Sequence, residues 1–226
     1  MNTGSVRLFA SVLARYLFVG IVLGCIFFLT AGTMSYFNGW MYIISMLTVM
    51  GIGFTVLFIK HKEVLEKRMR SKEKEKEQKA FVLISGLLVS GLYILPGFDF
   101  RYKWTNVPMW LSVVSMIIVM VFYGLNVLVM IQNSYASRTV EIQKEQKVID
   151  TGMYSIVRHP MYLVIIPIYI FSPLALGSYI ALIAGALFPF TLILRIMNEE
   201  KVLIDGLDGY KEYMKKVKYR LIPYIW

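Results

Sequence analysis

RHPMYLVIIPIYIFSPLALGSYIALIAGALFPFTLILRIMNEE, residues 158–200, is the stretch that decides the fold. Its apolar part runs from Pro160 to Met197, which is too long for one membrane span, because about 20 residues cross a bilayer as a helix. Pro173 and the pair Gly177-Ser178 interrupt this run and favour a break there. The stretch therefore predicts two helices in a tight hairpin, whose two polar ends return to the same side of the membrane.

The rest of the chain is also strongly apolar. Of its 226 residues, 58% are hydrophobic and only 17% are charged, and the mean hydropathy is +0.62. A soluble domain does not need repeated apolar runs of bilayer length. We therefore expect an all-α, polytopic transmembrane helical bundle with five to six membrane helices. Besides the hairpin, the apolar runs cover residues 16–30, 40–59, 80–97 and 108–131.

Polar segments divide the chain into two parts. Residues 1–131 are expected to hold the N-terminal transmembrane helices and a basic loop at 60–79. Residues 132–226 are expected to form a catalytic half, with a polar segment, the hairpin and a polar tail. Within the loop, the alternating charges of residues 72–77 are typical of a solvated helical extension or a flexible loop.

The net charge is +10, and the basic residues fall between the apolar runs. The loop at 60–79 carries nine Lys or Arg, and residues 132–159 and the tail are also basic, whereas residues 31–39 carry none. The positive-inside rule then predicts an integral membrane protein with both termini and the hairpin's polar ends on the cytoplasmic side. Basic residues in such places favour contact with membrane lipids rather than nucleic acid.

Several classes of function are disfavoured by what the chain contains. Its two histidines, His61 and His159, lie far apart, and Cys25 is the only cysteine, so the spacing of a metal site is missing. Transporters carry charges near the membrane midplane and often show internal repeats. Here the charges gather at one face and no repeat is visible, which also argues against a transporter.

The polar end before the hairpin predicts an anion-binding helix entrance. Pro160 suits a first helical turn, so His159 would lie where the backbone N–H groups of the helix are unpaired. Arg158 adds a positive charge, Tyr154 and Tyr162 add aromatic faces, and Gly152 permits a tight turn where a ligand could approach the backbone.

The polar end after the hairpin predicts an acidic cluster. Arg195 and Glu199 are four residues apart and would share one helix face, while Glu200 would point about 100° away. Taken singly, Arg195 and Glu199 could be an ordinary ion pair at the membrane boundary, and Glu200 a solvated acid. His159 could be a helix cap, and the tyrosines could belong to an interfacial aromatic belt. Brought together by the hairpin, they suit S-adenosylmethionine. Its carboxylate would bind cationic donors, its ammonium group would bind a carboxylate, and its sulfonium would pack against aromatic faces.

An ordered set of motifs lies at residues 133–140, 146–152, 157–162, 173–178, 198–200, 210–213 and 219–223, together with Tyr154 and Arg195. Through this set, the second half of the chain resembles the isoprenylcysteine carboxyl methyltransferase family. The similarity implies a helical membrane enzyme that binds S-adenosylmethionine near the cytosolic face and methylates a lipophilic or prenylated acceptor from the bilayer. The chain departs from the family pattern at Met153, where Pro is common, at Val164, where Gly is common, and at Tyr224, where Gly is often found.

This resemblance also suggests roles for individual residues. Arg195 is the candidate for holding an acceptor carboxylate, and Glu200 or His159 for deprotonating an amine or thiol acceptor, so O-, N- and S-methylation all stay open. An NADPH-dependent membrane reductase is the alternative, because sterol reductases share a His-Pro-x-Tyr element and a similar tail. The residues expected to bind the cofactor are Gln146, Gly152, Tyr154, Arg158, His159, Tyr162 and Glu199.

Overall fold

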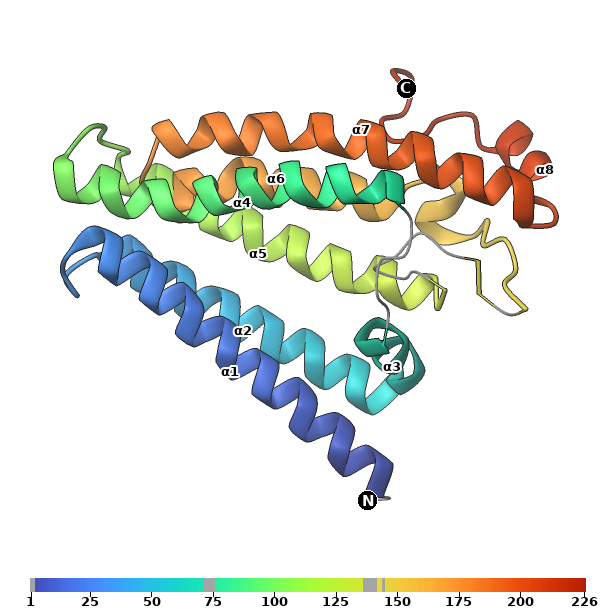
Figure 1. The fold of residues 1–226 in the computed structure, drawn as a ribbon, viewed down its shortest axis with the longest axis horizontal. Helices are drawn as coiled ribbons and strands as arrows, with labels where there is room; N and C mark the ends of the chain where they lie inside the picture. Colours follow the sequence, from blue (N-terminus) through green and yellow to red (C-terminus); the bar gives the residue numbers. More distant parts are fainter. Residues whose placement is uncertain (1–2, 71–75, 136–141, 144) are drawn as a thin grey trace.

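The computed structural model describes residues 3–70, 76–135, 142–143 and 145–226, and the regular elements in this part of the chain are all helical (Figure 1). The charged run at 72–77, expected to be a solvated helical extension or a flexible loop, therefore lies mostly outside the described residues, as does most of 133–140. The elements are α1 (Thr3–Ala31), α2 (Phe37–Lys60), α3 (Lys62–Arg70), α4 (Lys76–Tyr102), α5 (Met109–Gln132), the 3₁₀ turn η1 (Gly152–Ser155), α6 (Pro160–Ala175), α7 (Ile180–Gly206) and α8 (Tyr210–Lys216).

Five of these helices are long and apolar enough to cross a membrane. They are α1, α2, α4, α5 and α7, with mean hydropathies between 2.0 and 2.5 over their most apolar windows. Helix α6 is apolar but has only 16 residues, about 24 Å at 1.5 Å per residue, against a hydrocarbon core of roughly 30 Å. The predicted transmembrane bundle is confirmed, with five full-length candidate spans and a shorter sixth helix.

The helices alternate in direction, so their connections gather at two ends of the bundle. Figure 1 shows the α1–α2, α4–α5 and α6–α7 turns at one end. Helices α3 and α8, the turn η1 and the N-terminus lie at the other end, and the tail runs back from α8 along α7. The predicted hairpin of α6 and α7 is confirmed, and its two polar ends meet at the end that carries α3 and α8.

Helix α4 runs further than the sequence predicts. The apolar run was expected to end near Gly97, but the helix continues through Pro96 and Gly97 to Tyr102. A proline inside a membrane helix is tolerated where neighbouring elements satisfy the backbone. Gly97 does not form a turn but packs against α1. A Cβ at this position would lie 1.8 Å from Thr30 Oγ1 of α1. The two helices can approach this closely only because residue 97 has no side chain.

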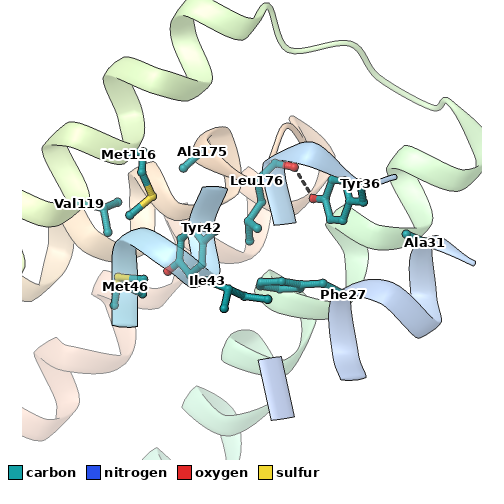
Figure 2. Close-up of a cluster of buried hydrophobic side chains, with 10 residues drawn as sticks. All are labelled: Phe27, Ala31, Tyr36, Tyr42, Ile43, Met46, Met116, Val119, Ala175 and Leu176. Atoms are coloured by element: carbon teal, nitrogen blue, oxygen red, sulfur yellow. Dashed lines mark hydrogen bonds between the residues drawn. The ribbon is translucent and has the colours of Figure 1, made fainter. Parts of the chain in front are cut away.

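The buried end of α6 is held by side chains of other helices (Figure 2). The last carbonyls of a helix have no partner inside that helix, and leaving them unpaired in lipid is costly. Around them packs a core of aromatic and aliphatic side chains that includes Phe27, Tyr42 and Met116. Three donors satisfy the carbonyls: Tyr36 Oη donates to Leu176, Asn38 Nδ2 donates to Ala175 over 3.0 Å, and Ser112 Oγ donates to Leu174 over 2.9 Å.

Replacement of Tyr36 by Phe tests this attachment. Tyr36→Phe leaves the ring in the core but removes the donor to the Leu176 carbonyl, so the free energy of unfolding should fall by about 1–3 kcal/mol. Denaturant titration of the detergent-purified protein measures the loss. Tyr102→Phe, at an exposed ring, is the control. Equal stability of the two variants would contradict the role given to Tyr36.

Candidate functional site

The unequal lengths of α6 and α7 create the site. Helix α6 has 16 residues and α7 has 27, and the two run antiparallel from a turn at their shared end. The last part of α7 therefore extends past the start of α6 at Pro160. Glu199 and Glu200 lie on this extension and face the residues that lead into α6, as the hairpin predicts.

Glu200 gathers two arginines and a histidine around one buried carboxylate. Its Oε1 accepts a hydrogen bond from Arg158 Nε over 2.7 Å and lies 3.3 Å from His159 Nε2. Its Oε2 accepts from Arg220 Nε over 2.7 Å. Glu200 is only 2% exposed and Arg158 only 7%, so the carboxylate is an internal anchor rather than a solvated acid. A buried carboxylate is stable only when such partners compensate for its lost hydration.

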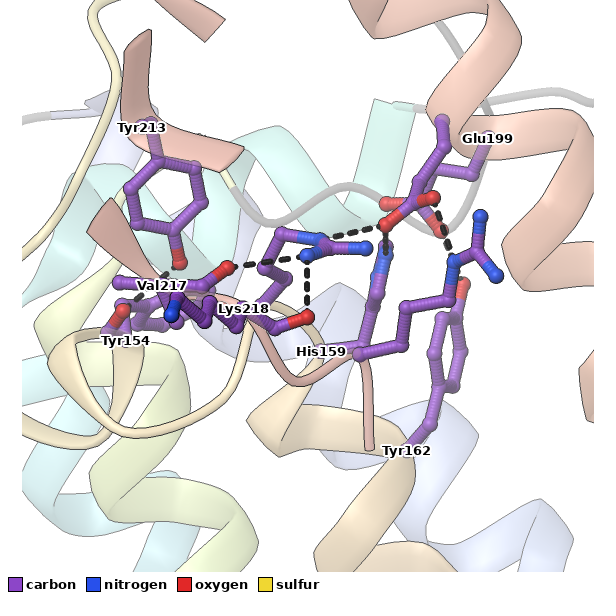
Figure 3. A network of polar contacts seen from close by, with 10 residues as sticks. Tyr154, His159, Tyr162, Glu199, Tyr213, Val217 and Lys218 are labelled. Atoms are coloured by element: carbon purple, nitrogen blue, oxygen red, sulfur yellow. Dashed lines mark hydrogen bonds and ion pairs between the residues drawn. The ribbon is translucent and has the colours of Figure 1, made fainter. Parts of the chain in front are cut away.

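Backbone contacts fasten the tail to the same place. The N–H groups of Arg158 and His159 donate to the carbonyls of Tyr219 and Arg220, each over 2.9 Å. Arg158 Nη1 also donates to the carbonyls of Val217 and Lys218 (Figure 3). The segment before α6, the end of α7 and the tail are thus joined around Glu200.

A second network centres on Tyr162. Arg195 Nε donates to Tyr162 Oη over 2.8 Å, and Tyr162 Oη donates to Glu199 Oε2 over 2.6 Å. The tyrosine hydroxyl therefore bridges the two residues that the sequence places on one helix face. The Arg195 guanidinium carbon lies 4.7 Å from the centre of the Phe81 ring of α4. The rings of His159 and Tyr162 stack with centres 5.7 Å apart, and Figure 3 shows them beside Glu199.

A pocket opens beside these two networks. It contains about 840 Å³ of empty space, including its open mouth. Its walls come from the segment before η1, the start of α6, the end of α7 and α8. Its lining is Asn133, Tyr135, Gln146, Lys147, Val148, Ile149, Tyr154, Arg158, His159, Met161, Tyr162, Glu199, Val202, Leu203, Leu207, Tyr210 and Tyr213.

One wall of the pocket is fixed by contacts that α8 makes with η1 and with Asp150, which precedes η1. Tyr213 Oη donates to the Tyr154 carbonyl over 2.7 Å (Figure 3). Lys216 Nζ lies 2.6 Å from Asp150 Oδ2, and this hydrogen bond lowers the pKa of the Asp150 carboxyl. Both contacts hold the segment before α6 against α8.

Tyr210 presents a polar atom that has no hydrogen-bond partner among the described residues. Its side chain is buried and lines the pocket, yet its hydroxyl makes no hydrogen bond with any described residue. Burial, reinforced by the negative charge of Glu200, raises the pKa of Tyr210, so the hydroxyl keeps its proton at neutral pH. A buried donor without a partner is costly, and a ligand in the pocket would satisfy it.

The structure brings most of the predicted site residues together at this pocket. Gly152, Arg195 and Glu200 are not among the described residues that line it. Arg195 and Glu200 contact lining residues from behind. Six predicted residues line the pocket: Gln146, Tyr154, Arg158, His159, Tyr162 and Glu199.

Gly152 serves the site through a protein contact. Its φ of +59° lies in the left-handed region, and a Cβ there would come within 2.6 Å of Gln132 Oε1. That oxygen accepts a hydrogen bond from the Met153 N–H over 2.9 Å. The glycine thus admits the Gln132 side chain of α5 at the place where the sequence suggested a ligand.

Sequence reasoning gave no role to several residues that build the site. Tyr210 and Tyr213 line the pocket, Lys147 lies at its wall and Arg220 completes the Glu200 cluster. Three of these belong to the tail motifs 210–213 and 219–223 that carry the family resemblance, which was the available signal. Their roles were hidden because nothing in the spacing shows that the tail folds back onto α7.

Comparison with protein families agrees with the geometry. Residues 113–205, from within α5 to the end of α7, match the model of the isoprenylcysteine carboxyl methyltransferase (ICMT) family. Over these residues the chain is similar to that family. The match begins before the expected boundary at 131/132, and α8 and the tail lie outside it. Comparison with individual curated proteins gives no match. The chain therefore combines five helices that are long and apolar enough to cross a membrane with a region similar to a methyltransferase family.

Neutralising Glu200 should weaken the whole end of the bundle. Glu200→Gln leaves Arg158 and Arg220 without their carboxylate, and breaking such a buried ion pair should lower the free energy of unfolding by about 3 kcal/mol. Unfolding in detergent measures this loss, and limited proteolysis reports release of the tail. Glu212→Gln, on the exposed side of α8, is the matched control and should leave both unchanged. If the two variants behave alike, Glu200 is not the anchor.

Proposed function

We propose that this protein is an S-adenosylmethionine-dependent methyltransferase whose acceptor is a lipophilic molecule from the bilayer, with a carboxylate as the favoured nucleophile. The observation that carries the proposal is the pocket at the start of α6, which combines an acid, cationic groups and tyrosine rings beside the membrane-spanning helices. The family match supports methyl transfer as the reaction class.

The pocket residues fit the groups of this cofactor. Glu199, oriented by Tyr162, would hold the ammonium group. The Tyr210 hydroxyl and Lys147 would bind the carboxylate. The faces of Tyr154, Tyr162 and Tyr213 would accommodate a cationic sulfur.

The chain's part in the reaction is alignment and exclusion of water. When bound, the cofactor supplies a methyl group on a sulfonium, and the S–CH₃ electron pair stays on sulfur as the new bond to the acceptor forms. A carboxylate acceptor is ionised at neutral pH and needs no base. Tyr162, fixed between Arg195 and Glu199, forms the wall that separates the pocket from Arg195. Holding the two reactants in line supplies most of the rate enhancement that such a site can give.

Arg195 and Glu200 take different parts in this proposal. Arg195 lies between Tyr162 of α6 and Phe81 of α4, so it would attract an acceptor carboxylate that approaches between α4 and α7. Glu200 would position His159 and Arg158 in the pocket wall rather than take a proton, because Arg158 and Arg220 already stabilise its charged form.

Cofactor binding tests the pocket assignment. The purified protein should bind S-adenosylmethionine with about micromolar affinity, or about −8 kcal/mol. Tyr210→Phe removes one donor and should weaken binding about tenfold, and Glu199→Gln should weaken it more because it removes a charge partner. Calorimetry measures both, with Tyr179→Phe and Glu212→Gln as controls at exposed positions. Unchanged affinity in both pocket variants would remove this assignment.

The acceptor is addressed by a separate experiment. Protein in nanodiscs is incubated with a total lipid extract and either methyl-labelled S-adenosylmethionine or NADPH. Labelled lipid, released again by mild base, would support an ester product. Base-stable label would favour an amine or thiol acceptor. Oxidation of NADPH without methyl transfer would favour the reductase.

We also propose that the end of the bundle carrying the site faces the cytoplasm. The described parts of the basic segments support this orientation, because α3, α8 and the N-terminus lie at the same end (Figure 1). S-adenosylmethionine would then reach the pocket from the cytosol.

Cysteine labelling tests the orientation. In a Cys25→Ser background, Lys211→Cys on α8 should react with an impermeant maleimide in inside-out vesicles and be protected in right-side-out vesicles. Lys103→Cys, after α4 at the other end, should show the reverse. The opposite pattern would place the pocket outside the cytoplasm.

A further inference from the structure

The end of the tail folds into a small closed loop, residues 221–226, which we call the hook. The N–H groups of Leu221 and Ile222 donate to the Trp226 carbonyl over 3.0 and 3.3 Å. The N–H groups of Ile225 and Trp226 both donate to the Ile222 carbonyl over 3.1 Å. The hook therefore has a defined conformation that its own backbone maintains.

The hook directs apolar side chains outward. Tyr224 is 89% exposed, Ile225 is 76% exposed and Ile222 is 40% exposed. Tyr224 also has a φ of +66°, in the left-handed region where a bulky side chain is strained and glycine is not. Its ring touches Tyr219, with centres 5.3 Å apart, but is otherwise open. Little packing inside the chain compensates for this backbone strain.

The hook lies at the level where the apolar helices begin. Its preceding residues, Tyr219 and Arg220, pair through their backbone with Arg158 and His159, directly before α6. Figure 1 shows the tail returning from α8 along the outer side of α7. On α7, Leu194 and Met197 are exposed apolar residues of that same region. The boundary of the bilayer therefore passes close to the hook.

We infer that the hook is an interfacial membrane anchor, with Tyr224 and Ile225 inserted among lipid headgroups and the upper acyl chains. Aromatic side chains are enriched at this depth, where an apolar ring and a polar hydroxyl are both satisfied. The exposed Lys215 and Lys218 precede the hook and favour anionic headgroups. Continuity with the transmembrane helices makes the bilayer, rather than a soluble protein, the partner that this surface fits.

The anchor is coupled to the site through one side chain. The Arg220 guanidinium lies 5.3 Å from the centre of the Trp226 ring and donates to Glu200 Oε2 over 2.7 Å. Glu200 in turn contacts His159, which lines the pocket. Seating the hook in the interface would hold Arg220, and with it the pocket wall, in the observed arrangement.

Spin-label accessibility in nanodiscs tests the anchor. The full-length protein, with Cys25→Ser and Ile225→Cys, is labelled and placed in discs of phosphatidylcholine and phosphatidylglycerol. We expect the label at 225 to collide with oxygen, which concentrates in lipid, more often than with a water-soluble nickel chelate. A label at Lys211→Cys on α8 should show the opposite preference.

A matched pair of glycine substitutions isolates Tyr224. Tyr224→Gly relieves backbone strain, so it should fold normally, but it should lower the oxygen preference of the label at 225 several-fold. Lys103→Gly relieves a similar positive φ of 54° at the other end of the bundle and should have no effect there. Nickel-accessible labels at 225 would overturn the anchor. So would labels shielded from both reagents, which indicate a protein contact, or an unchanged preference in Tyr224→Gly.

Discussion

The arrangement of the site depends on one buried carboxylate. Glu200 is compensated only when Arg158, His159 and Arg220 are all in place, and these come from the segment before α6 and from the tail. A buried charge that loses a partner is strongly destabilising, so the three segments assemble together or not at all. The pocket therefore has a rigid base, although its lining extends along the chain from Asn133 to Tyr213.

The shortness of α6 places a second demand on the fold. A helix that ends inside the bundle exposes carbonyls that lipid cannot satisfy. Tyr36 and Asn38, from the start of α2, and Ser112 of α5 satisfy them. The start of α2 and the first turns of α5 therefore hold the far end of α6, while the Glu200 cluster holds its near end. The first two helices thus support the site without contributing to the described lining of its pocket.

The sequence predicted the features that follow from chain periodicity. Apolar runs identified the membrane helices, and a hairpin with a short turn had to bring His159 near Glu199 and Glu200. Contacts between side chains of different helices could not be predicted from the periodicity of the chain. The spacing of Arg195 and Glu199 suggested a simple pair, whereas Tyr162 of the facing helix lies between them. Glu200 looked like a solvated or catalytic acid because its partner Arg220 comes from a tail whose return has no periodic signal.

The two halves of the Tyr162 network face different surroundings. Arg195 packs on Phe81 of α4, on the side of the transmembrane helices, whereas Glu199 lines the pocket that α8 and residues 146–149 close on the aqueous side. The Tyr162 hydroxyl touches both. In the proposed reaction this hydroxyl lies between the lipid-borne acceptor and the water-borne cofactor. A shift of α6 relative to α7 would move it away from one of the two partners, which is why both ends of such a short helix are held so firmly.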